Sequence, residues 1–217
     1  MSPSPSHVLL FGGSFNPVHQ QHVAMAEAAR RQGPPGTELW WVPAGQPWQK
    51  PEGLVPAPHR LAMLERALQG LAGHRLCTLE LERTGPSYAV HTVRALQALH
   101  PHTRFSWLLG EDQLLRLTSW FEWSRFLALV RLVVVRRPRP VQDGSQDDLQ
   151  DDDTTHQVHP DVKACGWDSV QLTESALSSS AIRQALLDGL PPPEGALHPE
   201  VARYIAQHGL YTAPTHP

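Results

Sequence analysis

Several features are scarce in this chain of 217 residues, and each scarcity excludes a class of protein. Two cysteines, Cys77 and Cys165, cannot build a disulfide framework, and both are expected to be reduced thiols. The formal net charge is only −3, so no electrostatic footprint indicates nucleic-acid binding. No apolar run approaches the roughly 20 residues of a membrane span. Residues 1–6 lack the basic start and apolar stretch of a secretion signal, so we expect a soluble cytoplasmic protein.

The residue spacings of common metal and nucleophile sites are also missing. His19 and His22 are not part of a His-Glu-x-x-His helix, and the cysteines form no pair at zinc spacing. No Ser/His/Asp or Cys/His set indicates a covalent intermediate. The acidic stretch within residues 139–160 lacks the EF-hand spacing and has few apolar residues. We predict a mobile, solvated loop there, with a divalent-cation site as the alternative.

Strand-like and helix-like segments alternate along the chain. The expected strands are His7–Phe11, Glu38–Pro43, Leu76–Leu81, Arg104–Leu109, Arg131–Val135 and Ser169–Leu172. The expected helices are His19–Gln32, Pro58–Leu71, Ser87–Leu99, Asp112–Leu117, Glu122–Leu129, Ser178–Asp188 and Pro199–Gln207. The strands are mostly continuous apolar runs, as in sheets covered on both faces. We therefore predict an α/β fold, a doubly wound, Rossmann-like parallel sheet with helices on both faces, in a single domain over residues 1–217.

The most informative segment is residues 11–22, where an apolar run breaks at Gly12 and Gly13 before a helix-like stretch begins. Backbone N–H groups released at such a break, together with the positive end of the helix dipole, hold phosphate. His19 and His22 are three residues apart and therefore share one helix face. Two imidazoles above a phosphate-binding turn indicate chemistry on a phosphate. Two ordinary surface or partly buried histidines are the alternative.

Two later segments carry related signals. Gly110 also follows an expected strand, so it and the first glycine pair can share the crevice at the carboxyl ends of a parallel sheet. Asp112, two residues later, is of a type favoured at helix caps. Residues 177–183 open another helix, where Arg183 lies one turn above Ser180 and its planar guanidinium can pair with a triphosphate. A capped amphipathic helix is the alternative for this segment.

These motifs together resemble a known family. Residues 12–22 are similar to the nucleotidylyltransferase signature Gly-Gly-Thr/Ser-Phe-Asp/Asn-Pro-x-His-x-Gly-His. Residues 110–112 resemble the superfamily's Gly-x-Asp, and residues 177–183 resemble its closing motif Ile-Ser-x-Thr-x-Ile-Arg. Residues 86–92, 118–123, 136–138 and 209–211 occur in the order and spacing of bacterial nicotinate mononucleotide adenylyltransferases. The resemblance extends from about His7 to Tyr211.

The resemblance implies AMP transfer from ATP to nicotinate mononucleotide, which gives nicotinate adenine dinucleotide and pyrophosphate in NAD biosynthesis. The catalytic residues that it implies are His19, His22, Lys50 and Arg183. The implied ATP-binding residues are Gly12, Gly13, Ser14, Phe15, His19, His22, Gly110, Asp112, Ser179, Ser180 and Arg183. The implied mononucleotide-binding residues are Asn16, Lys50, Ser87, Tyr88, Trp120 and Arg137. We expect Mg²⁺ to be held mainly by ATP and water, and a homo-oligomer is possible.

The chemistry expected from this resemblance needs no protein base. The 5′-phosphate of the acceptor is largely ionised at neutral pH and attacks the α-phosphate in line. Alignment and charge stabilisation then supply catalysis, with His19 and His22 donating to phosphate oxygens. The family's Trp at the position of Trp120 stacks on the pyridine ring, and an indole face suits a flat heterocycle. The alternative is that Trp120 and Trp123 fill a core.

The chain departs from the family pattern at a few positions. Gln21 replaces the usual Gly between the histidines, and Gln49 replaces the usual His before Lys50. Asn16 stands for the commoner Asp, and Ala89 for a Thr beside the pyridine pocket, so main-chain N–H groups are expected to bind the acceptor's carboxylate. Two other functions remain open: an adenylyltransferase for another acceptor such as pantetheine phosphate, and a non-catalytic nucleotide-binding module.

Overall fold

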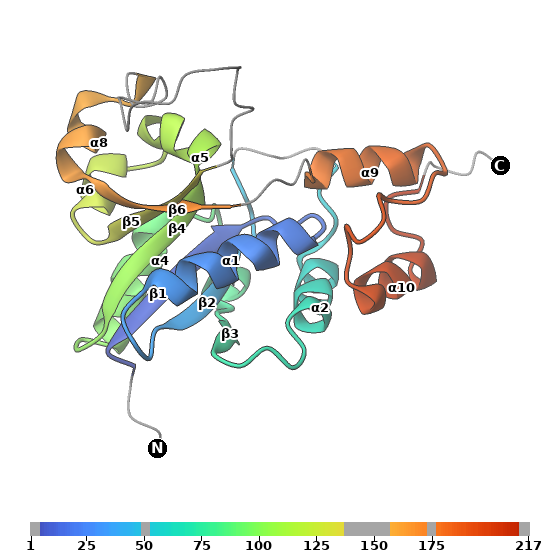
Figure 1. The fold of residues 1–217 in the computed structure, drawn as a ribbon, viewed down its shortest axis with the longest axis horizontal. Coiled ribbons are helices and arrows are strands. Elements are labelled where there is room, and N and C mark those ends of the chain that lie inside the picture. The colour runs from blue at the N-terminus through green and yellow to red at the C-terminus, as the bar shows by residue number, and fades with distance from the viewer. Residues whose placement is uncertain (1–4, 49–52, 137–156, 173–176, 213–217) are drawn as a thin grey trace, which may run out of the picture.

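Six parallel strands make up one sheet in the computed structural model, which describes residues 5–48, 53–136, 157–172 and 177–212. The strands are β1 (His7–Gly13), β2 (Glu38–Pro43), β3 (His74–Leu76), β4 (Arg104–Gly110), β5 (Arg131–Arg136) and β6 (Trp167–Gln171). Their spatial order is β3-β2-β1-β4-β5-β6 (Figure 1). The chain moves outward from β1 to β3, returns to the centre at β4, and continues to the other edge. The predicted doubly wound parallel sheet is therefore confirmed.

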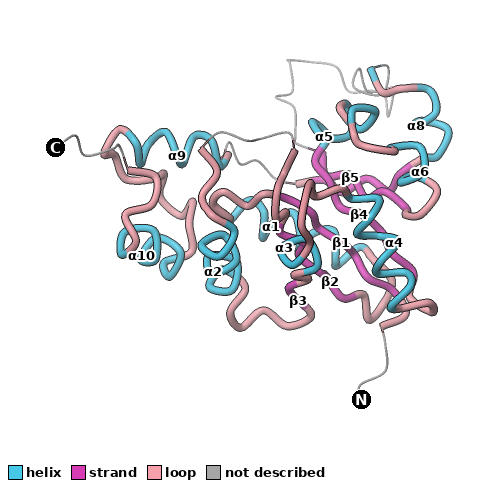
Figure 2. Tube along the Cα trace, turned by 180° about the vertical axis from the view of Figure 1, so that it is seen from behind, coloured by secondary structure: helices cyan, strands magenta, loops and turns pink. Residues whose placement is uncertain are grey.

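Helices cover both faces of this sheet. They are α1 (Gln20–Gln32), α2 (Ala57–Ala67), α3 (Leu79–Glu82), α4 (Ala89–Leu99), α5 (Glu111–Leu115), the 3-10 helix η1 (Leu117–Ser119), α6 (Trp123–Leu127), α8 (Pro160–Cys165), α9 (Ser179–Leu187) and α10 (Pro199–Gln207). Figures 1 and 2 view the molecule from opposite sides, with α1 in front of the sheet in one and α4 in front of it in the other. In the described ranges, no helix is long and apolar enough to cross a membrane.

The alternation of side chains along β1 explains the two apolar layers. Val8 and Leu10 point to the face covered by α4 and α6, and both are fully buried. Leu9 and Phe11 point to the opposite face, where they pack with residues of α1, α2 and α10. Successive side chains of a strand alternate between faces, so a central strand covered on both sides must be apolar throughout. This requirement is why the continuous apolar runs of the sequence predicted the strands.

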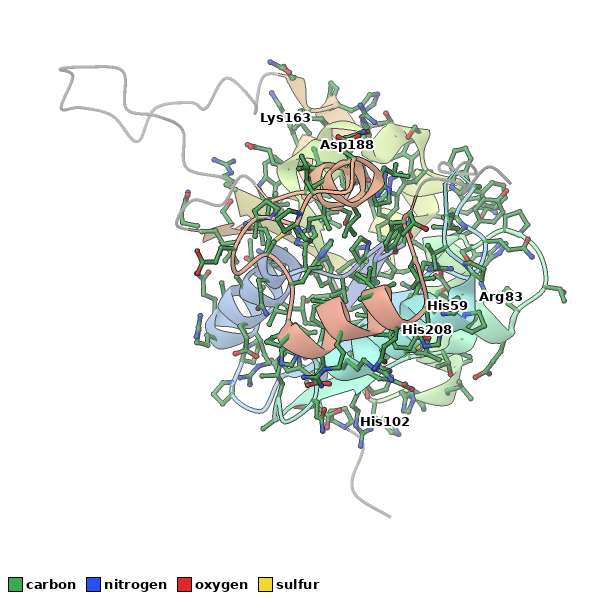
Figure 3. The ribbon with its side chains drawn as sticks, turned by 90° about the vertical axis from the view of Figure 1, so that its right-hand side faces the viewer. His59, Arg83, His102, Lys163, Asp188 and His208 are labelled. Carbon is green, nitrogen blue, oxygen red and sulfur yellow. The ribbon has the colours of Figure 1, made fainter. Side chains whose placement is uncertain are left out.

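Helix α10 packs against α2. A hydrogen bond of 2.9 Å joins His59 Nδ1 on α2 to the hydroxyl of Tyr204 on α10. The rings of His59 and His208 lie 5.2 Å apart, and Figure 3 looks onto this side with both residues labelled. The guanidinium of Arg66 lies 4.2 Å from the centre of the Tyr204 ring. Tyr204 therefore anchors α10 by packing, by one hydrogen bond and by a cation–π contact.

One predicted strand is wrong in part. The segment expected as a strand over Leu76–Leu81 contains only the last residue of β3, and its second half is helix α3. Apolar residues alternate there, as they do in a strand, but the carboxyl group of Glu80 accepts a hydrogen bond of 2.7 Å from Thr92 Oγ1 on α4. The chain must turn to bring this group inside, and this tertiary contact overrides the local pattern.

The predicted acidic loop also needs a correction at its end. Residues 139–156 lie outside the described residues. The last residues of the expected loop are ordered, because Val158 is buried in the apolar layer and His159 Nδ1 accepts a hydrogen bond from the backbone N–H of Asp161. Pro160 then begins α8, a helix that the sequence analysis did not predict. Proline at the first helical position is favourable because its missing N–H needs no partner there.

Arg60 of α2 is a fully buried cation beneath the carboxyl ends of the strands. Its guanidinium donates to the carbonyl oxygens of Val55, Ser14 and Gly45 at 2.9, 2.8 and 3.2 Å. Burial lowers the pKa of Arg60, but the ordinary value of a guanidinium is so high that the group stays charged. One side chain therefore joins the segment after β1 to the segment after β2.

We predict that Arg60→Met lowers the free energy of unfolding by at least about 2 kcal/mol, because three partly buried carbonyls lose a charged donor. Arg66→Met is the matched control on the same helix. It removes a partly exposed guanidinium with one carbonyl partner, and should cost less than about 1 kcal/mol. Urea unfolding of both variants measures the difference. Equal losses would show that the three carbonyls do not depend on Arg60.

Candidate active site

A cavity of about 1110 Å³ opens at the carboxyl ends of β1, β4 and β5. Parallel sheets bind ligands at this position, next to the switch in strand order between β1 and β4. The predicted site residues that line the cavity are Gly12, Gly13, Ser14, Phe15, Asn16, His19, His22, Ser87, Tyr88, Gly110, Asp112, Trp120, Ser179, Ser180 and Arg183. Lys50 and Arg137 lie outside the described residues. Segments far apart in sequence thus meet at one cavity.

The end of β1 brings two glycines, Gly12 and Gly13, to the cavity wall. A Cβ atom at Gly12 would lie 2.3 Å from Cζ2 of Trp107, so a side chain there would displace a core indole. A Cβ atom at Gly13 would lie 3.1 Å from the Phe15 ring. Phe15 itself is buried and packs against Phe11 and Trp41, so its ring forms the floor beneath the turn. The two glycines therefore let the end of β1 pack closely against Trp107 and Phe15 where it lines the cavity.

The two histidines lie together at the start of α1. Their ring centres are 3.7 Å apart with an angle of 30° between the planes. The backbone N–H of His19 donates to Nδ1 of His22 at 3.2 Å. When His22 is neutral, this bond leaves its proton on Nε2. His22 can then donate from Nε2 to an anion in the cavity that both residues line.

Helix α9 is fixed to the β1–α1 turn by side-chain donors. The hydroxyl of Ser179 donates to the carbonyl oxygen of Pro17 at 2.9 Å. Arg183 donates from Nη1 to the carbonyl oxygen of Asn16 at 2.8 Å and from Nη2 to the Ser180 hydroxyl at 3.3 Å. The start of α9 and the Arg183 guanidinium therefore lie beside the histidine turn, where both can bind an anion.

Asp112 is not the cap residue of the helix that follows β4. Gly110 is the residue at the N-cap of α5, and Asp112 lies inside the first turn. A Cβ atom at Gly110 would lie 2.7 Å from Oδ1 of Asp112, so the carboxylate folds back over the glycine. Asp112 is exposed and lines the cavity, and its carboxylate can accept hydrogen bonds from a sugar hydroxyl.

Trp120 fits both interpretations of the sequence. Its ring packs near Trp107 and Phe126, with ring centres 6.3 and 5.4 Å apart, and it also lines the cavity. Tyr88 lies at the same end of the cavity, stacked on Phe121 at 4.3 Å with an angle of 21°. One side of the Trp120 indole thus packs against core side chains, and another side lines the cavity. This arrangement can hold a flat aromatic ring.

Glu80 is a site residue that the sequence analysis missed. It is buried, lines the cavity, and accepts hydrogen bonds from the hydroxyls of Thr92 and Ser87. The oxygen of Ser87 in turn accepts from the backbone N–H groups of Gly45 and Gln46 at 3.0 and 3.2 Å. Burial raises the pKa of Glu80 above its ordinary value, against the effect of these hydroxyls. The carboxyl thus joins α4 to the loop after β2.

Asn16 has a role beyond the predicted one. Its Oδ1 accepts hydrogen bonds from the Val55 N–H and the Tyr211 hydroxyl, and its Nδ2 donates to the Gly53 carbonyl. Within the described part of the chain, these bonds leave the amide one N–H for a ligand. Asn16 therefore holds the β1–α1 turn in place while it lines the cavity. Tyr211 was noted in the sequence only as part of a matching ending, because its contact spans almost the whole chain.

Comparisons with known proteins identify the family of this chain. A family model described as cytidylyltransferase-like matches residues 10–185. The Gloeobacter violaceus protein named "Probable nicotinate-nucleotide adenylyltransferase" is 37% identical over 209 residues, which are 94% of this chain and 96% of that protein. A protein of the same name from Albidiferax ferrireducens is 38% identical over 202 residues, 93% of this chain and 96% of that protein. This chain belongs to the nicotinate-nucleotide adenylyltransferase family.

Solved structures show the same fold at lower identity. The nicotinic acid mononucleotide adenylyltransferase of Plasmodium falciparum complexed with NaAD has a TM-score of 0.72 and 18% sequence identity, with 95% of this chain and 97% of that one covered. The same enzyme complexed with APC has a TM-score of 0.70. The family resemblance inferred from the sequence is confirmed.

Nucleotidyltransferases generally use a divalent metal ion. In residues 5–48, 53–136, 157–172 and 177–212, no group of three or more His, Cys, Asp or Glu side chains is arranged to hold one. The cavity instead presents paired imidazoles and a guanidinium, which bind anions. This donor set fits a metal ion that arrives with phosphate oxygens rather than one held in a protein cage.

We predict that Glu80 makes stability depend on pH in a defined direction. The pKa of Glu80 is raised in the folded state. The stability that this group contributes to the fold is therefore fully present below the ordinary carboxyl pKa, and it is lost as pH rises through the pKa of the folded state. Glu80→Gln cannot titrate, so the wild type should gain stability relative to this variant when pH is lowered from about 7 to about 4.5. Urea unfolding across this range measures the gain.

Glu82→Gln is the matched control, because it replaces an exposed carboxyl on the same short helix. This variant keeps the Glu80 carboxyl, so the pH dependence assigned to Glu80 should remain in its unfolding curves. Parallel curves for wild type and Glu80→Gln would show that burial does not perturb the Glu80 carboxyl.

Proposed function

We propose that this protein transfers AMP from ATP to nicotinate mononucleotide and releases pyrophosphate, as the names of its relatives indicate. One observation carries the proposal. A single cavity joins the His19–His22 pair and Arg183, which suit a triphosphate, to a pocket with Trp120 and Tyr88, which suits an aromatic acceptor. An enzyme that joins two nucleotides needs both halves in one enclosure, because the reacting phosphates must be held in line.

The acceptor supplies the nucleophile in this mechanism. Its 5′-phosphate is largely ionised at neutral pH, so it needs no protein base. An oxygen of this phosphate bonds to the α-phosphorus of ATP as the bond from that phosphorus to the bridging oxygen breaks. The bridging oxygen leaves on pyrophosphate, which takes the electron pair. The protein therefore acts by alignment and by stabilising charge on the phosphates.

His22 is the proposed donor to that developing charge. The bond from the His19 N–H to Nδ1 fixes the ring orientation, so Nε2 carries the proton of the neutral ring. The start of α1 adds the positive end of its dipole beside both rings. His19 lies against His22, and both rings share the cavity wall, so we assign them together to the α- and β-phosphates.

Arg183 and the start of α9 are proposed to hold the outer phosphates. The guanidinium has five N–H donors, of which two go to Asn16 and Ser180, and the rest can pair with phosphate oxygens. Ser179 and Ser180 bring hydroxyls of the first turn to the same wall. Mg²⁺ is proposed to be held mainly by ATP phosphates and water, where it neutralises charge on them.

The acceptor's base is proposed to lie beside Trp120 and Tyr88. The helix start at α4 follows Tyr88 directly, and Tyr88 makes no side-chain cap there. Backbone N–H groups at a helix start bind carboxylates, which suits the acid group of nicotinate. Gly110 and Asp112 are proposed for the adenosine of ATP. Lys50 and Arg137 stay assigned to mononucleotide binding, and Lys50 also to catalysis, by the sequence resemblance alone.

Pyrophosphate release tests the proposal directly. Purified protein with Mg²⁺, ATP and nicotinate mononucleotide should release pyrophosphate and form the dinucleotide, observed by a coupled assay and by mass spectrometry. Reactions with nicotinamide mononucleotide, with pantetheine phosphate, and with no acceptor run in parallel. Turnover only with pantetheine phosphate, or with none of the acceptors, would overturn the proposal.

We predict that His22→Ala lowers turnover by at least about 100-fold, because a donor to the transition-state charge is lost. His59→Ala is the matched control. It removes a histidine of the α2–α10 contact and should leave turnover within about twofold, as expected for a change that touches no transition-state group. Steady-state kinetics of the pyrophosphate assay measures both. Near-normal turnover of His22→Ala would remove His22 from the mechanism.

A further inference from the structure

The last described turn of the chain returns to the active site. Helix α10 ends at Gln207, and the backbone N–H of Leu210 then donates to the Ile205 carbonyl at 3.1 Å. Tyr211 follows with a φ of 62°, a left-handed conformation that a bulky residue rarely adopts. Its hydroxyl donates to Oδ1 of Asn16 at 2.7 Å. A residue near the C-terminus thus contacts the β1–α1 turn across 195 positions of sequence.

The direction of this hydrogen bond is determined by the neighbours of Asn16. The Gly53 carbonyl can only accept, which assigns Nδ2 to it, and the Val55 N–H can only donate, which assigns Oδ1 to it. The Tyr211 hydroxyl faces that same oxygen, so it must donate. Burial raises the pKa of Tyr211, although the nearby Arg60 and Arg183 oppose the shift, so the phenol keeps its proton near neutral pH.

Asn16 connects Tyr211 to a proposed catalytic group. The side chain of Asn16 holds the phenol, and its main-chain carbonyl accepts from Nη1 of Arg183 at 2.8 Å. The same guanidinium donates to Ser180 at the start of α9. If Asn16 shifted, the carbonyl that orients Arg183 would shift with it. The phenol therefore sits one residue away from the group that is proposed to hold triphosphate.

We propose that Tyr211 is a positioning residue for adenylyl transfer: its hydroxyl fixes Asn16 and, through the Asn16 carbonyl, the guanidinium of Arg183. This inference rests on the proposed function, because the reaction is its readout. Tyr211 acts from behind the cavity wall and contacts no reacting atom. The closing segment of the chain is therefore part of the site's alignment, in addition to its packing against the apolar layer.

Tyr211→Phe and Tyr204→Phe make a matched pair for the test. Each removes one phenol hydroxyl and one hydrogen bond from a Tyr near the C-terminus, but the bond of Tyr204 goes to His59 at the α2–α10 contact. Tyr211→Phe should lower kcat by about fivefold to tenfold relative to Tyr204→Phe, the size expected for one hydrogen bond that aligns a catalytic group. In Tyr211→Phe the KM for nicotinate mononucleotide should change by less than kcat does, because Nδ2 of Asn16 keeps its bond to the Gly53 carbonyl, and in Tyr204→Phe it should stay within about twofold of wild type.

Thermal unfolding separates this role from simple stabilisation. The two variants should unfold within a few degrees of each other, because each loses a hydrogen bond of the same kind. Equal kcat values for the two variants would overturn the proposal, whatever their stabilities. An inactive wild type would instead overturn the proposed function, so the two failures are distinguishable.

A double-mutant cycle tests whether the effect passes through Arg183. In an Arg183→Ala background there is no guanidinium to align, so adding Tyr211→Phe should change kcat by less than about twofold. The same fivefold to tenfold loss in both backgrounds would show that Tyr211 does not act through Arg183 and would overturn the proposed link.

Discussion

Side-chain donors hold the carbonyl oxygens of the turn between β1 and α1, and the site depends on this arrangement. Arg60 donates to Ser14, Arg183 to Asn16 and Ser179 to Pro17. Buried or half-buried carbonyls need partners, and this turn has neither a strand nor a helix to supply them. Donors from α2 and α9 therefore satisfy the turn and set its position relative to the cavity at the same time.

Much of the fold and the position of the cavity was predictable, because both follow from local sequence patterns. Gly12 and Gly13 at the end of β1 lie only a few residues before the helix start at His19, and continuous apolar runs predicted the buried strands of the sheet. The placement of Gly12 and Gly110 at one cavity followed from the topology rule for parallel sheets, since both end central strands. The family resemblance then implied a role for each residue at these positions.

The missed residues share a different property, which is that their partners lie far away in sequence. Arg60 looks like an ordinary charged residue of an amphipathic helix, yet its partners include Ser14, 46 positions earlier. Glu80 lies in a segment whose alternation predicted a strand, and only its contacts with Ser87 and Thr92 explain the helix. Local periodicity carries no information about such pairs, because they depend on how the finished elements pack.

Arg183 both holds the β1–α1 turn and faces the cavity. Its planar guanidinium can direct one N–H to the Asn16 carbonyl, another to Ser180 and the others to the cavity, all from one rigid group. A lysine ammonium has three donors on a flexible stem, and using two of them for the turn would draw its charge away from a ligand. The same geometry therefore explains why the turn is fixed before a ligand arrives. The folded protein already orders the guanidinium, so a phosphate ligand would not lose binding free energy to the entropy of ordering it.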